Sequence, residues 1–177
     1  RNYRRGVELA RKDALASGDS MFDSARASFG RKLGEAMAAL GDHLAADGIL
    51  REILDMPEID RATRGRIQLA LARVARMRGR HEDATRQLVT CLELVSGANP
   101  EIEAQVQLEI GELRTMSGQW PQATNAFRRA IEILNPRDGD KATLARAFAR
   151  LAEGALVAND AAACRAALVN AEREALR

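Results

Sequence analysis

An internal repeat of about 40 residues is the feature that most constrains how this chain of 177 residues can fold. A turn-forming residue recurs at spacings of 38, 39 and 41 residues, at Gly41, Gly79, Gly118 and Asn159. Eight residues before each turn stands a branched aliphatic residue: Leu33, Leu71, Ile110 and Leu151. The residue that follows it is small in every copy: Gly34, Ala72, Gly111 and Ala152.

The segment after each turn repeats in the same way. Five residues after the turn the side chain is small, and the residues are Ala46, Ala84, Ala123 and Cys164. Nine residues after the turn it is large, and the residues are Leu50, Leu88, Phe127 and Leu168. Apolar residues at steps of three and four on both sides of a turn predict a hairpin of two amphipathic helices. Small residues at matched places let such helices approach to about 8 Å.

Helix-start signals and prolines divide the chain into copies of this hairpin. Asp60, Asn99 and Asp140 stand at N-cap positions before three of the predicted first helices. Pro57, Pro100 and Pro136 fall between copies, where proline does not interrupt a helix. We therefore expect one domain over residues 1–177, with repeats at 20–58, 60–97, 99–136 and 140–177. Residues 1–17 are expected to be the second helix of a preceding repeat, in a fragment of a longer protein.

The third copy, "IGELRTMSGQWPQATNAFRRAIEILNP" from Ile110 to Pro136, resembles the tetratricopeptide repeat (TPR) family. The matching positions are Gly111, Gly118, Ala123, Phe127, Ala130 and Pro136. The spacings exceed the usual 34 residues, so the chain is similar to the longer-helix branch of about 40 residues found in signalling scaffolds and bacterial regulators. The resemblance implies an all-α, right-handed helical-hairpin solenoid. Arg114 departs from the family pattern, and Ala75 and Ala155 fill the same place poorly.

The resemblance also implies a concave wall of first helices that binds a peptide or helix of a partner protein. Residues three, six and thirteen before the turn carry this face, and they are Arg76, Arg73 and Arg66 in the second copy and Thr115, Glu112 and Gln105 in the third. Two and ten residues before the turn stand Met77, Met116, Leu69 and Leu108. Flexible apolar side chains beside fixed charges suit a partner with apolar anchors and acidic groups. The methionines and leucines equally suit a core.

Residues with catalytic or metal-binding chemistry are explained by the repeat. His81 lies two residues after its turn, where His43 and Trp120 stand in other copies, so a structural role is favoured. The resemblance implies that the residue at this place closes the helical hairpin. Cys91 and Cys164 occupy places where other copies carry alanine. Phosphate-binding glycine loops and metal-ligand motifs are absent from the sequence. We therefore predict a protein that is not an enzyme and uses no cofactor or metal.

Charge and hydropathy leave two further functions open. Between residues 61 and 86 there are eight arginines and two acidic residues, which would suit contacts with nucleic acid, but no aromatic residue is interleaved for base stacking. Self-assembly through end helices is the other alternative. No apolar run approaches the roughly 20 residues that span a membrane, and the start lacks the pattern of a secretion signal. The sequence is thus interpreted as a cytoplasmic, bacterial signalling scaffold.

Overall fold

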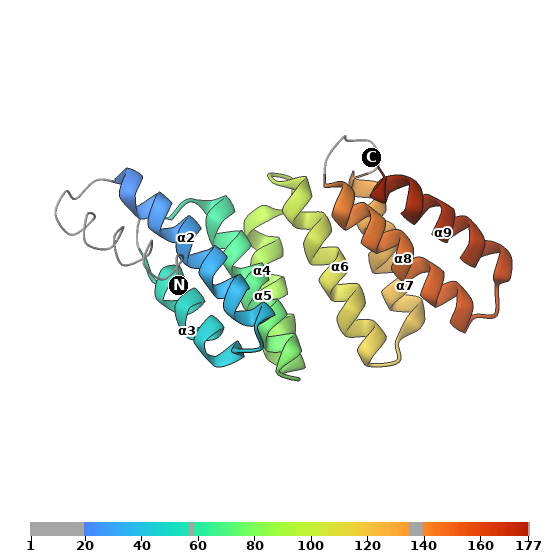
Figure 1. Ribbon diagram of the computed structural model, residues 1–177, viewed down its shortest axis with the longest axis horizontal. Coiled ribbons are helices and arrows are strands. Elements are labelled where there is room, and N and C mark those ends of the chain that lie inside the picture. The colour runs from blue at the N-terminus through green and yellow to red at the C-terminus, as the bar shows by residue number, and fades with distance from the viewer. Residues whose placement is uncertain (1–19, 57–58, 135–139, 177) are drawn as a thin grey trace. The chain divides into compact units, whose positions relative to one another are not determined.

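The computed structural model describes residues 20–56, 59–134 and 140–176, and every regular element in them is an α-helix (Figure 1). The helices are α2 (Ser20–Ala39), α3 (His43–Leu54), α4 (Arg61–Met77), α5 (His81–Val95), α6 (Pro100–Met116), α7 (Trp120–Leu134), α8 (Lys141–Val157) and α9 (Ala161–Ala175). The all-α class predicted from the sequence is confirmed. The helix expected over residues 1–17 lies outside the described residues, as do Pro57 and Pro136.

Each predicted turn joins two helices through the same backbone arrangement. Gly41, Gly79, Gly118 and Asn159 have φ angles of 84°, 71°, 70° and 56°, in the left-handed region. The residue after each turn donates its backbone N–H to a carbonyl five residues earlier, as Arg80 does to Ala75 at 2.9 Å. This is the Schellman ending of a helix, which satisfies carbonyls left open in the last turn. Asn159 is the one copy without glycine, and asparagine tolerates this conformation better than most residues.

Aspartate and asparagine begin the helices. Asp60, Asn99 and Asp140 accept hydrogen bonds from the backbone N–H groups of Thr63, Ile102 and Thr143 respectively, which confirms the three predicted caps. Asp42 and Asp160 cap α3 and α9 in the same manner. Such caps contribute about 1 kcal/mol each to helix stability.

The chain divides into two compact units between Leu94 and Val95, in the last turn of α5. In the first unit α2 packs on α3 and both pack on α4. Their shared core contains Leu50 and Ile53 of α3 and Ile67, Leu71 and Val74 of α4. The Sγ of Cys91 in α5 donates to the carbonyl of Gly65 in α4 at 3.1 Å, so α5 lies directly against α4.

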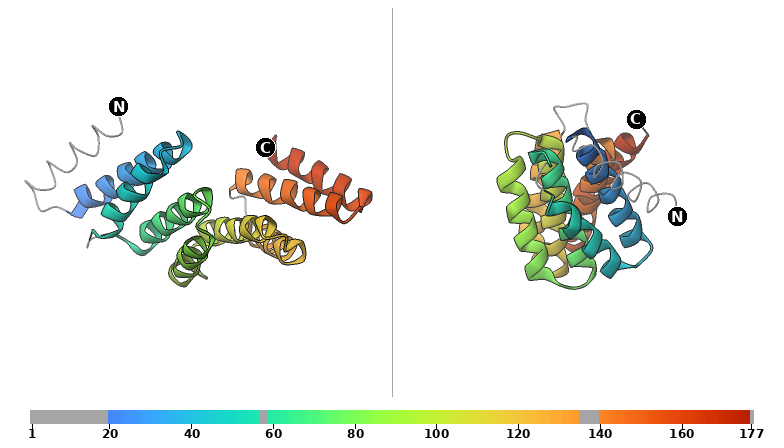
Figure 2. Two further views of the ribbon diagram at one scale, coloured as in Figure 1. Left: turned by 90° about the horizontal axis from the view of Figure 1, so that it is seen from below. Right: turned by 90° about the vertical axis from the view of Figure 1, so that its left-hand side faces the viewer.

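In the second unit α6 pairs with α7 and α8 pairs with α9, and α8 also packs on α6 and α7. Figure 2 shows α8 and α9 side by side. The core contains Leu108 of α6, Phe127 and Leu134 of α7, and Leu144 and Ala147 of α8. The assignment of all 177 residues to one array of four repeats stays a prediction.

The small residue before each turn allows close helix packing, as the sequence predicted. A Cβ built on Gly111 in α6 would lie 2.2 Å from Cε1 of Phe127 in α7. A Cβ on Gly34 in α2 would lie 2.7 Å from Cγ of Leu50 in α3. Both distances are far below the ordinary contact of about 3.5 to 4.0 Å between carbon atoms. Glycine at these positions therefore sets how closely the paired helices approach.

Candidate functional site

A hollow of about 300 Å³ lies between the first helices α2 and α4 of the first unit. Its lining is mostly apolar, and comprises Glu35, Ala38, Ala39, Leu50, Ala70, Arg73, Val74 and Met77. Met77 is 49% exposed, whereas Leu50, Ala70 and Val74 belong to the buried core. We call this feature the α2–α4 hollow. It brings together Arg73 and Met77 of the predicted groove with Glu35, which stands six residues before its turn as Arg73 does.

The α2–α4 hollow is flanked by charge of both signs. Glu35 accepts a hydrogen bond from Arg31 of the same helix at 2.6 Å, which holds its carboxylate in place. Helix α4 contains five arginines and no acidic residue. Arg73 and Arg76 are half-buried on this helix. Arg66, nearer the start of the helix, is exposed. An anionic group entering the hollow would therefore meet a positive potential from α4.

Two leucines predicted for the groove do not lie on a surface. Leu69 is 2% exposed and Leu108 is fully buried, and Leu108 belongs to the core of the second unit. Both leucines therefore occupy core positions, which is the alternative that the sequence left open. Met77 and Met116, at 49% and 54% exposed, are instead accessible. The methionines stand two residues before the turn, where the helix end leaves one side uncovered.

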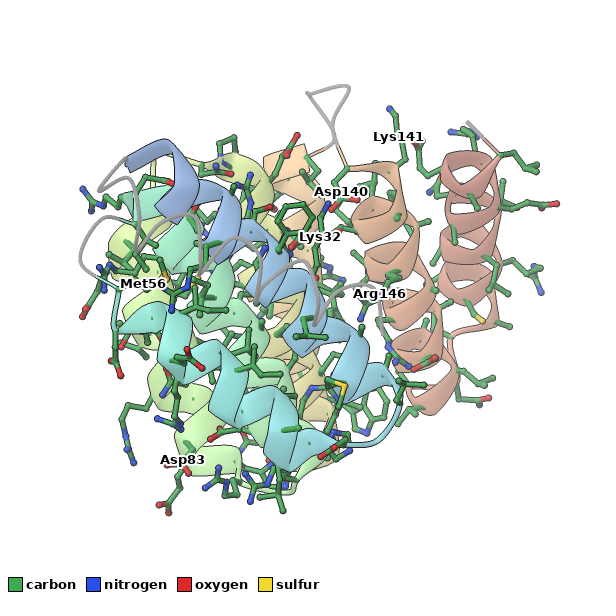
Figure 3. The ribbon with its side chains drawn as sticks, turned by 60° about the vertical axis from the view of Figure 1, so that its left-hand side comes forward. Lys32, Met56, Asp83, Asp140, Lys141 and Arg146 are labelled. Carbon is green, nitrogen blue, oxygen red and sulfur yellow. The ribbon has the colours of Figure 1, made fainter. Side chains whose placement is uncertain are left out.

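In the second unit, the predicted residues on α6 contact α8. Glu112 is buried and accepts a hydrogen bond at 2.8 Å from Nε of Arg150, which also pairs with Glu153 at 2.8 Å. Arg146 lies 3.8 Å from Glu112 and 3.9 Å from the buried Glu109. Figure 3 shows Arg146 on α8, well along the helix from Lys141. The charges at this position therefore bind the two first helices to each other.

Gln105 joins α6 to α8, whereas Thr115 makes no such contact. Nε2 of Gln105 donates at 2.6 Å to the carboxylate of Asp140, the N-cap of α8, which Figure 3 shows at the start of that helix. Thr115 is half-buried, and its Oγ1 makes no hydrogen bond within the described part of the chain. Glu109 and Arg150 were missed by the sequence reasoning. They stand nine residues before their turns, a position that the helical period places on the same stripe as the predicted ones.

Several arginines of the cluster over residues 61–86 form hydrogen bonds or ion pairs inside the first unit. Arg61 donates to the carbonyl of Glu93 at 2.8 Å, and Arg64 to the carbonyl of Leu54 at 3.2 Å. Arg80 lies 3.6 Å from both Asp47 and Asp83. Asp83, labelled in Figure 3, also pairs with Arg86 at 3.2 Å. Counting charges along the sequence overstated this patch, because Asp47 comes from α3, outside the counted segment.

Asp47 is the acidic centre of these contacts. Arg51, one helical turn further along α3, donates to both carboxylate oxygens of Asp47, at 2.8 and 3.3 Å. The hydrogen bond from Arg51 and the positive charges of Arg51, Arg80 and Arg78 hold the pKa of Asp47 below its ordinary value, although burial acts in the opposite direction. The carboxylate therefore stays ionised well into the acid range.

The residues considered for catalysis or metal binding are not brought together. His43, His81 and Trp120 are the first residues of α3, α5 and α7, in agreement with their shared place in the repeat. No group of three or more metal-binding side chains occurs among the described residues. Burial raises the pKa of the Cys91 thiol to about 11, so this cysteine is protonated near neutral pH. Cys91 thus behaves as a small apolar residue.

Comparison with known proteins places the fold. No family model matches the chain, and no curated protein matches it. The crystal structure of BtubC (BKLC) from P. vanneervenii is similar over 99% of this chain and 89% of that one, with a TM-score of 0.56 and 19% identity. The crystal structure of MamA is similar over 95% of this chain and 85% of that one, with a TM-score of 0.62 and 14% identity. Both are TPR-type helical repeat proteins, so the predicted fold class, a TPR-like solenoid, is confirmed.

Among the described residues, none of the helices has the length and apolar character that crossing a membrane requires.

Proposed function

We propose that this chain is a protein-interaction module that binds a helix or extended segment of a partner protein at the α2–α4 hollow. The observation that carries the proposal is the hollow itself, an apolar recess of about 300 Å³ between two first helices with Glu35 and Arg73 in its lining. A recess with apolar walls and a few fixed charges is the usual form of a site that takes one anchoring side chain. The TPR-like fold supports a function in protein binding.

The lining defines the chemistry of the partner segment. Alanines and Val74 make the walls shallow and apolar, so an aliphatic anchor such as leucine or methionine fits better than a polar side chain. Met77 at the mouth has a flexible side chain that can adapt to the shape of the anchor. Helix α4 contributes arginines and no acidic residue, so acidic residues beside the anchor are favoured. The partner segment is therefore amphipathic and acidic.

A pair of designed peptides tests this function. One is an amphipathic helix with leucines on one face and glutamates on the other, and its control carries lysines in place of the glutamates. Fluorescence anisotropy is expected to show binding of the acidic peptide and at least about tenfold weaker binding of the basic one. Equal affinity for both peptides would show that the arginines of α4 do not select an acidic partner.

Two kinds of variant locate the binding surface. Ala39→Trp fills the hollow from an exposed position and is expected to abolish binding, while Ala142→Trp, at an exposed position on α8, is the matched control. Arg73→Glu combined with Arg76→Glu is expected to weaken binding of the acidic peptide, with helical content and melting temperature checked in parallel. If the acidic peptide binds Ala39→Trp and the double arginine variant as well as the unaltered chain, the hollow is not the site.

Nucleic-acid binding is the competing function, because Arg66 is exposed on α4 and four other arginines lie on the same helix. Single-stranded RNA and duplex DNA should be tested at low salt against the acidic peptide. Our proposal expects negligible nucleic-acid affinity, since four of the eight arginines counted in the sequence are held in contacts within the unit. An affinity that exceeds that for the peptide and falls steeply with salt would replace the proposed function.

A further inference from the structure

A second hollow, of about 240 Å³, lies in the second unit between α7, α8 and the start of α9. The side chains that line it are small or apolar, apart from those of Thr124, Arg128 and Asp160. We call this feature the α7–α9 hollow. None of its lining residues takes part in the function proposed above.

The same place in the first unit, formed by α3, the end of α4 and the start of α5, is occupied by ion pairs. Asp47 of α3 accepts hydrogen bonds from Arg51 at 2.8 and 3.3 Å and lies 3.6 Å from Arg80, which precedes α5. Arg80 is also 3.6 Å from Asp83. Every helix at this place has a counterpart in the second unit, so the two places differ in their side chains.

The second unit lacks the side chains that fill this place in the first. Counted from the turns, Asp47, Arg78, Arg80 and Asp83 correspond to Thr124, Ala158, Asp160 and Ala163. Val74 of α4 likewise corresponds to Gly154 of α8. A Cβ built on Gly154 would lie 3.2 Å from Oγ1 of Thr124, so the threonine hydroxyl lies directly before α8. These exchanges account for the α7–α9 hollow.

The exchanges also leave two charges without the partners that the first unit provides. Arg128 corresponds to Arg51, but its side chain makes no hydrogen bond or ion pair within residues 20–56, 59–134 and 140–176. Asp160 stands in place of Arg80 and caps α9 through one oxygen, which accepts from the N–H of Ala163 at 2.9 Å. Its carboxylate forms no ion pair in the same part of the chain. Thus the lining offers a cation that lacks a carboxylate and a carboxylate that lacks a cation.

We propose that the α7–α9 hollow binds a small zwitterion of the class of free α-amino acids. The carboxylate of the ligand contacts Arg128, in the way that Asp47 contacts Arg51, and it accepts a hydrogen bond from the hydroxyl of Thr124. The ammonium group of the ligand pairs with Asp160. A short apolar side chain on the ligand contacts the alanines of the lining.

The size of the α7–α9 hollow favours a free amino acid over a segment of a protein. Its volume is slightly below the range of about 300 to 1,000 Å³ that is usual for sites of drug-sized ligands. A residue within a peptide has no charge on its backbone, so a peptide would need two side chains to match both charges. An α-amino acid carries the carboxylate and the ammonium group on one carbon atom.

Nuclear magnetic resonance of the whole chain, labelled with ¹⁵N, tests the site with L-valine as the probe. Saturable shifts are expected for the backbone amides of Thr124, Gly154 and Ala163, while the amide of Gly48 in the first unit should not move. N-acetyl-L-valine lacks the positive charge and L-valinamide lacks the negative one. Each is expected to bind at least about tenfold more weakly, because it leaves one charge of the lining unmatched.

The titration has outcomes that would overturn the proposal. One is the absence of saturable shifts with L-valine up to about 10 mM, which would correspond to negligible affinity. Another is equal affinity for L-valine and its two derivatives, since the charges of Arg128 and Asp160 would then not select the ligand.

Substitutions on α7 test the role assigned to Arg128. Arg128→Gln is expected to weaken L-valine binding about tenfold, and Arg129→Gln, at the next exposed position of the same helix, is the control and should have no effect. Thr124→Asp places a carboxylate one turn before Arg128, as Asp47 stands before Arg51, and should weaken binding at least about tenfold by occupying the arginine. Thr124→Ser keeps the hydroxyl and should preserve the affinity. The proposal is wrong if Arg129→Gln weakens binding as much as Arg128→Gln, or if Thr124→Asp binds L-valine as the unaltered chain does.

The α7–α9 hollow is separate from the site of the proposed function. It is built from residues of the second unit, and the α2–α4 hollow is built from residues of the first. The two proposals are tested with different ligands and different variants, so failure of either leaves the other standing.

Discussion

Replacing Gly111 with alanine is expected to destabilise the second unit, although alanine is the better helix former. The new Cβ would lie 2.2 Å from Cε1 and 2.5 Å from Cδ1 of Phe127. Restoring an ordinary contact requires the ring to move by more than about 1 Å. Phe127 is fully enclosed in the core with Leu108, Ala130 and Leu144, so the ring has no free space to enter.

The magnitude follows from two opposing effects. Alanine gains about 1 kcal/mol over glycine in a helix interior. Overpacking a rigid, enclosed side chain costs about 1 to 3 kcal/mol, and a displaced aromatic ring lies at the upper end. The net loss is then about 2 kcal/mol, or roughly 4 to 8 °C in melting temperature for a chain of this size. Gly48→Ala in α3 is the control, because a Cβ there meets nothing within 4 Å, and it should stabilise by up to about 1 kcal/mol.

Urea unfolding followed by circular dichroism measures both changes, and Trp120 fluorescence follows the change in the second unit. Trp120 is the only tryptophan in the sequence and begins α7, so its emission reports on the unit that contains Gly111. In a Phe127→Leu background Gly111→Ala should cost little, which gives a coupling energy of about 2 kcal/mol between the two sites. The reasoning is refuted if Gly111→Ala stabilises the unaltered chain as Gly48→Ala does, or if the two substitutions on this helix pair are additive.

Two further outcomes are expected. In the native protein a thiol reagent should modify Cys164 and spare Cys91, whose pKa burial raises to about 11, and modification of both before unfolding would contradict this. Stability should fall on acidification: the hydrogen bonds of Arg51 to Asp47 and of Thr63 to Asp60 lower the pKa of each carboxyl, so their contribution is complete above the unfolded pKa of about 3.9 and is lost as the pH falls through the lower folded pKa. Melting temperatures of Asp47→Asn should vary less with pH in that range than those of the unaltered chain.

Short-range interactions made much of this fold predictable. The turn at Gly79 requires a left-handed backbone, and the cap at Asp60 is formed with a residue only three positions away. Both depend on neighbours along the chain, so a period of turns and caps is visible without any tertiary contact. The close approach of the two helices at Gly111 followed from the same period, because small residues recur at this place in each hairpin.

The candidate site was predicted less completely, because a helical period assigns a residue to a face and does not say what covers that face. Leu69 and Leu108 share a stripe with Arg73 and Glu112, yet neighbouring helices bury both leucines. The partners of the charged residues could not be predicted from the helical period either. Arg150 reaches Glu112 from 38 residues away, across a contact between α6 and α8.

The sequence by itself determined the helices, their turns, their caps and the small residues between paired helices, since each of these is decided within one hairpin. Only the tertiary structure decided which charged residues form ion pairs between helices and which residues are exposed. It placed Asp47 against Arg80, and it left Met77 and Leu168 exposed. The physical reason is that burial and ion pairing depend on the packing of one hairpin against the next, and the residues concerned are far apart along the chain.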